Sequence, residues 1–242
     1  MAAHRLLIDT LRAGLQAQAD AARAGPMQAY MKSALPFHGI AAPLRRQITA
    51  AVVRHHPLGD SLSLADTMRA LWDEARFREE RYAASELARQ RPHRPLLALP
   101  LLPVFEHMIV TGAWWDHCDE LSAEAIGPLL ARHPNEMKPV LRQWARGADL
   151  WLRRAAILCQ RGLKREFDAA LLYDCILPSI GPASAANPWP GEFFLRKGIG
   201  WALRERSYDA PEEVRAFCAE YAAQLAPLTV REALKALKRR GA

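Results

Sequence analysis

The sequence predicts an all-α protein. Three observations lead to this prediction: Ala, Leu and Arg dominate the composition, only 13 of the 242 residues are Gly, and no stretch alternates β-branched with polar residues as a strand would. Half of the residues are hydrophobic, which is enough for a sizeable buried core. We therefore expect a single folded domain over residues 1–242.

Apolar residues recur at helical spacing in eight segments, each bounded by Pro, Gly or a capping residue. In chain order these segments are Leu6–Leu15, Leu44–Val53, Leu62–Leu71, Tyr82–Leu87, Leu121–Leu130, Leu150–Leu158, Phe193–Leu203 and Val214–Leu225. Thr229 and Glu232 have the spacing of a capping box, and Asp209 to Glu212 has a related form with Pro211 in the first turn, so helices are expected to begin at both places. About a dozen helices joined by short turns predict helix pairs stacked into a solenoid, with a globular bundle as the alternative.

The charge balance favours a polyanionic partner. There are 33 Lys and Arg residues against 26 Asp and Glu, a formal charge of +7, although a solubilising surface bias would give the same balance. The four cysteines form no CxxC pair and indicate reduced thiols. The N-terminus lacks the apolar stretch of a signal peptide, and the longest apolar run, Leu96–Phe105, is too short to span a bilayer. We expect a cytoplasmic monomer that does not contact membranes.

The first candidate cluster is a double tryptophan followed by acidic residues. Trp114 and Trp115 are about 100° apart on a helix, so one should be buried and the other should face outward. Trp115 and Asp119 are four residues apart, which places an indole and a carboxylate on one surface. An aromatic face and a carboxylate both stabilise positive charge, so this pair indicates a site for a cation.

A second cluster follows the apolar positions of Leu150–Leu158. Arg154, Arg161 and Arg165 recur at helical spacing and form a basic stripe. Such a stripe suits contact with phosphates, although a solvated helix face explains it equally well.

The third cluster lies in Glu192–Glu205. Gly198 and Gly200 inside a helix each cost about 1 kcal/mol relative to Ala, so either close helix packing or close approach of a ligand requires their small size. Lys197, Trp201 and Arg204 fall on one helix face as an aromatic flanked by cations. The preceding loop, Gly181–Gly191, contains Trp189, for which docking on the fold is favoured over contact with a ligand.

Five segments together resemble, in family order, motifs of the AlkD-type DNA alkylation repair enzymes, which are HEAT-like repeat DNA glycosylases. They are Ala29–Lys32, Gly39–Arg46, Trp114–Asp119, Leu150–Leu158 and Glu192–Glu205, and they cover most of the chain. The resemblance implies a C-shaped array of antiparallel helix pairs with a basic concave face that binds duplex DNA. It also implies excision of N3- and N7-alkylated purines without a metal or other cofactor. The chain departs from the family pattern in its longer Gly181–Gly191 loop and in the additional charge of Arg153.

The resemblance assigns the site residues. Trp115, Asp119 and Trp201 are implied to be catalytic, Arg154 to belong to the same group as a DNA contact, and Tyr30 to lie near the DNA backbone. The basic residues Arg161, Lys197 and Arg204 complete the expected DNA-binding set.

The chemistry of these side chains is consistent with that assignment. A purine alkylated at N3 or N7 is already cationic, so it leaves as a neutral base and needs no general acid. The positive charge then develops on the deoxyribose, where a carboxylate and aromatic faces stabilise it. Asp119 could also position the attacking water. The family contacts the deoxyribose and backbone and leaves the lesion exposed, unlike glycosylases that flip the base into a pocket.

Three alternatives remain. The first is a non-catalytic protein of the same architecture that recognises bent or branched DNA by its shape and phosphates. The second is a helical scaffold for protein partners, which leaves Trp115, Asp119 and Trp201 unexplained. The third is a metallohydrolase, but His55 and His56 belong to no HExxH or other spaced ligand set.

Overall fold

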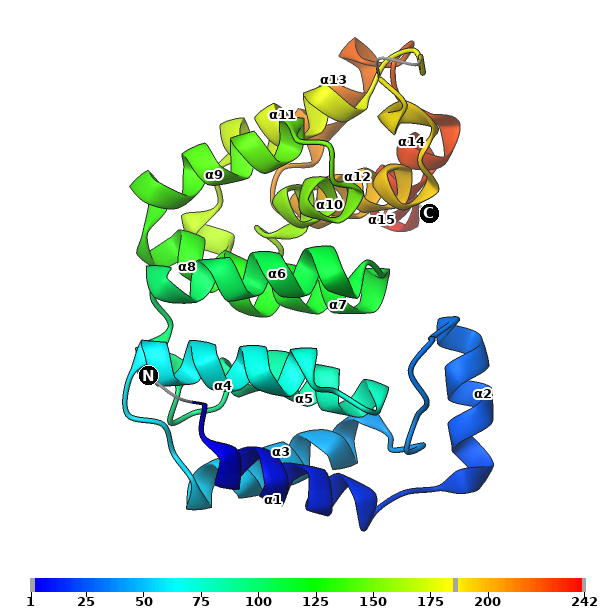
Figure 1. Ribbon diagram of the computed structural model, residues 1–242. Helices are drawn as coiled ribbons and strands as arrows, with labels where there is room; N and C mark the ends of the chain where they lie inside the picture. Colours follow the sequence, from blue (N-terminus) through cyan, green and yellow to red (C-terminus); the bar gives the residue numbers. More distant parts are fainter. Residues whose placement is uncertain (1–2, 185–186, 241–242) are drawn as a thin grey trace. The chain divides into compact units, whose positions relative to one another are not determined.

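The computed structural model describes residues 3–184 and 187–240, the last three without their side chains. This part of the chain contains helices and no strand, which confirms the predicted all-α class (Figure 1). The chain divides into two compact units, Met1–Met108 and Ile109–Ala242, and the division falls within one helix, α6.

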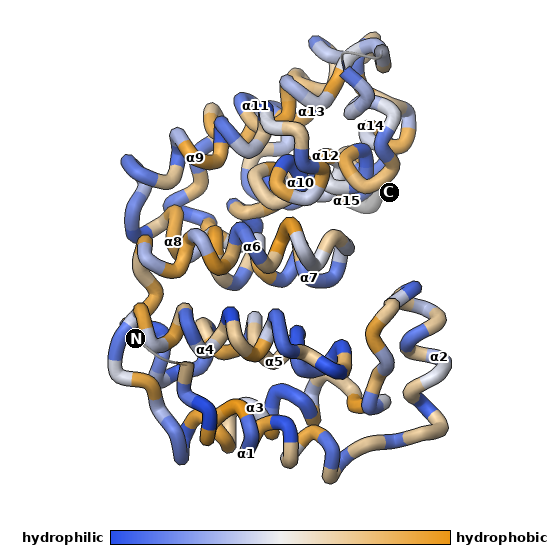
Figure 2. Tube along the Cα trace, viewed as in Figure 1, coloured by the Kyte–Doolittle hydropathy of each residue, from blue (hydrophilic) through white to orange (hydrophobic). Residues whose placement is uncertain are grey.

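The N-terminal unit is built from amphipathic helices. They are α1 (Arg5–Gln16), α2 (Ala21–Met31), α3 (Ala42–His55), α4 (Ser61–Asp73), α5 (Arg78–Leu87) and the first part of α6 (Leu102–Gly112). Figure 2 shows apolar and polar residues interleaved along these helices. In α1, for example, Leu7, Leu11 and Leu15 recur every four residues and are buried. Helix α5 packs against both α3 and α4, and α1 packs against α3.

Buried carboxylates also organise the N-terminal unit. Glu79 accepts hydrogen bonds from three consecutive backbone amides, those of His38, Gly39 and Ile40, at 2.9–3.1 Å. Gly39 has φ +88°, and a Cβ there would lie 2.1 Å from the carbonyl oxygen of Asp20. The close approach of Gly39 to Asp20 and the hydrogen bonds from this segment to Glu79 therefore explain why a glycine stands at position 39.

The C-terminal unit continues with helices of 6 to 14 residues. They are α7 (Trp115–Leu121), α8 (Gly127–Arg132), α9 (Pro134–Arg146), α10 (Leu150–Leu158), α11 (Ala169–Ile176), α12 (Phe193–Arg206), α13 (Pro211–Glu220), α14 (Pro227–Ala233) and α15 (Lys235–Arg240). A π-helical segment, Ser122–Ile126, joins α7 to α8. Helix α10 lies against α7, α9 and α12, and α12 packs closely against α14.

Near the C-terminus, two of the predicted helix boundaries differ from the observed ones and a third agrees. Helix α14 begins at Pro227, so the capping-box prediction was wrong: Thr229 lies inside the helix, and its hydroxyl donates to the carbonyl of Arg196. Helix α13 begins at Pro211 as predicted, although no side chain caps it. Helix α13 ends at Glu220 and not at Leu225 as predicted: after Glu220 the chain forms a turn, in which the amides of Gln224 and Leu225 donate to the carbonyl of Tyr221.

Candidate active site

A buried ion pair joins α10 to α7. The Nε and Nη2 atoms of Arg154 donate to the two carboxylate oxygens of Asp119 at 2.7 and 2.8 Å. Arg154 is only 1% exposed, whereas the side chain of Asp119 is 13% exposed. The third guanidinium nitrogen, Nη1, donates to the carbonyl oxygen of Phe194, the second residue of α12. Arg154 thus fixes the orientation of a partly accessible carboxylate and ties it to two neighbouring helices.

The local sequence explains how Arg154 reaches this position. Asp149 caps α10 by accepting hydrogen bonds from the amides of Trp151 and Leu152, which sets where the helix begins. On α12, Gly198 leaves room for the guanidinium: a Cβ there would lie 3.0 Å from Nη1 of Arg154. Close packing, rather than a ligand, therefore accounts for this glycine.

The predicted basic stripe does not form. Arg154 was expected to face phosphates, but it is buried and its guanidinium is bonded within the protein. Helix α10 ends at Leu158, so Arg161 follows it in a turn and Arg165 lies in the short 3-10 segment Lys164–Glu166. The helical spacing of the three arginines failed as evidence because the helix does not extend to the last two.

Trp201 of α12 lies beside this ion pair. The centre of its ring is 5.4 Å from the guanidinium carbon of Arg154 and 5.4 Å from Nζ of Lys197. The indole is partly exposed. An indole in this position can contact both the buried pair and a ligand at the surface.

The two tryptophans of the first cluster have different neighbours, but both are partly exposed, so the prediction that one of them is buried was wrong. Trp114 precedes α7 and packs against the rings of Trp151 and Phe194, at centroid distances of 6.2 and 5.5 Å. Trp115 is the first residue of α7, one turn before Asp119, and is partly exposed. The helix that was expected to carry Trp115 and Asp119 together is therefore present.

An acidic residue of α14 completes the surroundings of Trp201. The carboxylate of Glu232 accepts a hydrogen bond from Nζ of Lys197 at 2.9 Å and another from Nη1 of Arg204 at 3.2 Å. The hydrogen bond from Lys197 is the main reason that the pKa of Glu232 is lowered. Sequence reasoning missed Glu232 because the capping-box interpretation had already given that residue a role.

A cavity of about 500 Å³ opens next to Trp201. It is lined by Arg161, Trp201, Arg204, Glu205, Tyr208, Lys235 and Ala236. The lining includes three cations, one carboxylate (Glu205) and two aromatic side chains, so the cations outnumber the acid, and this composition suits a phosphate. Arg161 of the second sequence cluster thus meets Trp201 and Arg204 of the third at one cavity.

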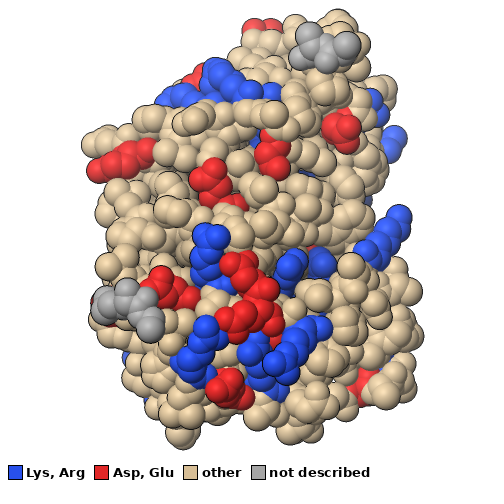
Figure 3. Space-filling view, in the orientation of Figure 1, with Lys and Arg blue, Asp and Glu red and all other residues tan. Residues whose placement is uncertain are grey.

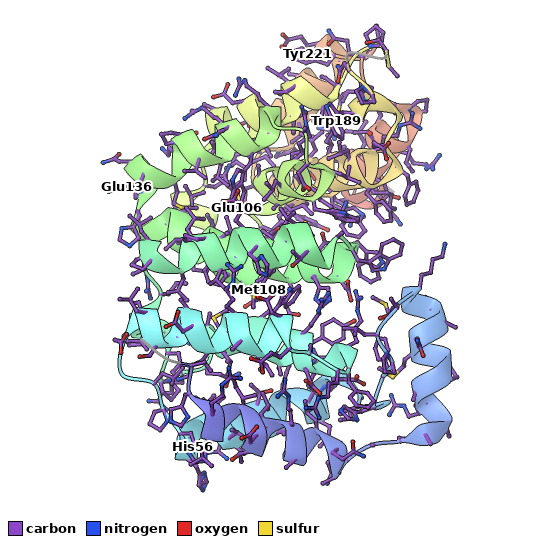
Figure 4. The ribbon with its side chains drawn as sticks, viewed as in Figure 1. His56, Glu106, Met108, Glu136, Trp189 and Tyr221 are labelled. Atoms are coloured by element: carbon purple, nitrogen blue, oxygen red, sulfur yellow. The ribbon has the colours of Figure 1, made fainter. Side chains whose placement is uncertain are left out.

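The additional charge of Arg153 has a structural role. Arg153 is buried, and its guanidinium donates to the carbonyl oxygens of Gly147 and Pro178 and to the hydroxyl of Ser179. Its guanidinium carbon is 4.4 Å from the ring centre of Trp189, which lies in the segment before α12 (Figure 4). Trp189 is therefore docked on the fold, as favoured; Ala185 and Ala186 of the same loop lie outside the described residues.

Tyr30 belongs to the N-terminal unit, on α2, and is 73% exposed. On the face of this unit drawn in Figure 3, acidic and basic side chains are intermingled. The ion pairs of the N-terminal unit include Arg5 with Glu74 and Arg69 with Asp73. The proposal that Tyr30 approaches DNA rests on its exposure and on the sequence resemblance.

The cysteines take no part in this site. All four are free and buried, and burial raises the pKa of Cys118, which is next to Asp119. Within the described residues no cluster of three or more His, Cys, Asp or Glu side chains could hold a metal. None of the described helices is long and apolar enough to cross a membrane.

Comparison with known proteins finds a family model and similar solved structures. A family model for the DNA alkylation repair enzyme matches residues 11–237. A solved structure described as a predicted DNA alkylation repair enzyme from Enterococcus faecalis is 28% identical, with a TM-score of 0.76 over 90% of this chain and 96% of that one. No curated protein sequence matches significantly.

Proposed function

The chain belongs to the family of DNA alkylation repair enzymes, and on this premise we propose that it is a DNA glycosylase. Its substrates are N3- and N7-alkylated purines in duplex DNA, and it hydrolyses their N-glycosidic bond without a metal. The observation that carries the proposal is the fixed carboxylate of Asp119, which is held by Arg154, whose guanidinium lies beside the indole of Trp201.

The proposed mechanism uses Asp119 as a charge rather than as an acid. As the neutral base departs, positive charge builds on the deoxyribose, and a pre-oriented carboxylate stabilises it without reorganisation. Asp119 and the rings of Trp115 and Trp201 serve the same purpose, and Asp119 also orients the attacking water. The carboxylate is partly accessible, which this role requires.

Arg154 acts as a positioning residue in this mechanism. Its buried guanidinium cannot contact a phosphate in this conformation, but it holds the carboxylate in place through two hydrogen bonds. Contacts with the DNA backbone instead fall to Arg161, Arg204 and Lys197, which lie around Trp201. A duplex bound there would place its backbone next to the catalytic group.

The test is incubation of the purified protein with duplex DNA that carries a single N7-methylguanine, followed by quantification of the released base. We expect release by the wild-type protein and strongly reduced release by Asp119→Asn. Binding of the duplex with no release would contradict the proposal and identify the protein as a non-catalytic DNA-binding member of the family.

A further inference from the structure

Glu232 is placed against the cationic face of α12 by a specific packing arrangement. Lys197, Gly200 and Arg204 are spaced three and four residues apart, so they form one row along the helix. Gly200 leaves a gap in the middle of this row, and a Cβ there would lie 2.6 Å from Cβ of Glu232. The absence of that Cβ lets α14 bring a carboxylate between the two cations.

This carboxylate is engaged by both cations. Glu232 is 9% exposed, while the side chains of Lys197 and Arg204 are 24% and 28% exposed. The two cations therefore remain reachable from solvent, but their charge is partly compensated from within the protein. A phosphate that approaches Lys197 and Arg204 also comes close to the carboxylate of Glu232, and the two negative charges repel each other.

We propose that Glu232 is a positioning residue that acts through Lys197 and Arg204 and restrains the binding of undamaged duplex. In the free protein it takes the place of a DNA phosphate on these cations, and a bound duplex must compete with it. An internal counter-ion at this position weakens the complexes with undamaged DNA. This weakening matters because undamaged DNA is in large excess over damaged DNA and its complexes are non-productive. This inference rests on the proposed DNA interface and does not require glycosylase activity.

The test is the affinity of Glu232→Gln for an undamaged fluorescent duplex, measured by anisotropy at several salt concentrations. One additional phosphate contact should steepen the slope of log K against log salt by about 0.9. The gain in affinity over wild type should consequently be about threefold larger at 50 mM than at 200 mM salt. A far-UV spectrum and a melting curve show whether the variant is folded.

The matched control for net charge is Glu136→Gln. Glu136 lies in the first turn of α9 and projects into solvent (Figure 4), so its loss changes the net charge by the same amount away from α12. We expect its salt slope to equal that of wild type. An equal steepening in both variants would overturn the inference, because it would show a general charge effect.

A double-variant comparison identifies the route. In an Arg204→Ala background the gain from Glu232→Gln should be at most half of its wild-type value, because one of the two cations is gone. An unchanged gain in that background, or no gain in the folded Glu232→Gln variant, would overturn the inference. The affinity measurements use undamaged DNA, so they do not depend on catalysis. If the wild-type protein released no base, that result alone would contradict only the proposed glycosylase function.

Discussion

The Asp119→Asn variant should lose both stability and activity, for different reasons. The substitution leaves the guanidinium of Arg154 buried at 1% exposure with no counter-charge. Breaking a buried pair in this way costs about 3–5 kcal/mol, and we take about 3 because the amide oxygen of Asn still accepts one of the two hydrogen bonds. For a chain of this size this amounts to a fall in Tm of about 6–12 °C. Excision should slow by about 100-fold or more, because a pre-oriented charge is lost.

A second substitution separates these two effects. In Asp119→Asn combined with Arg154→Gln, two neutral amides can hydrogen-bond to each other, so neither is left as an unpaired charge. The double variant should recover at least half of the lost Tm, measured by calorimetry, and should excise as slowly as Asp119→Asn. If excision returned together with Tm, Asp119 would have only a structural role and the reasoning would be refuted.

Two further predictions concern the support of this site and the pH dependence of the fold. Gly198→Ala should slow excision about tenfold while the protein remains folded, because the new Cβ would displace Arg154. Single-turnover base release measures the rate of excision, and a melting curve shows that the variant is folded. An unchanged rate would contradict this role for the glycine. His93 is buried as a neutral imidazole: its Nε2 accepts a hydrogen bond from the amide of Leu58 and its Nδ1 donates one to the carbonyl of Leu87. Burial lowers the pKa of His93. The contribution of His93 to the stability of the fold is therefore present above about pH 6.5 and is lost as the pH falls. The free energy of unfolding should therefore decrease from pH 7 to pH 5.5 by urea denaturation, and His93→Gln should be less stable at pH 7 but flatter over this range; an equally steep decrease would assign it to other groups.

The fold class could be predicted because helical periodicity is a local property. Segments such as Leu6–Leu15 and Leu150–Leu158 correspond to α1 and α10, and their apolar residues are buried. Helices α2, α6, α9 and α11 were not predicted as segments. In α2, for example, Met31 alone is buried, so no apolar stripe marks this helix.

The site was only partly predictable, because charge type does not reveal exposure. The sequence placed Trp115 and Asp119 on one helix, and the structure agrees. Arg154 has the residue type of a phosphate ligand, yet the pocket beside Gly198 and the carboxylate of Asp119 bury it, and both partners are more than 30 residues away in sequence. Pairing of Glu232 with α12 depends in the same way on the packing of two helices, which no local pattern records.

The most direct test of the central claim is single-turnover base release from identical duplexes that carry either a cationic or a neutral lesion. If Asp119, Trp115 and Trp201 act only by stabilising positive charge, N7-methylguanine and N3-methyladenine should be released, whereas hypoxanthine and uracil should not. Asp119→Asn should abolish most of the difference by slowing release of the cationic bases. Efficient release of hypoxanthine or uracil by the wild-type protein would contradict the account, because it would require a general acid that protonates the departing base.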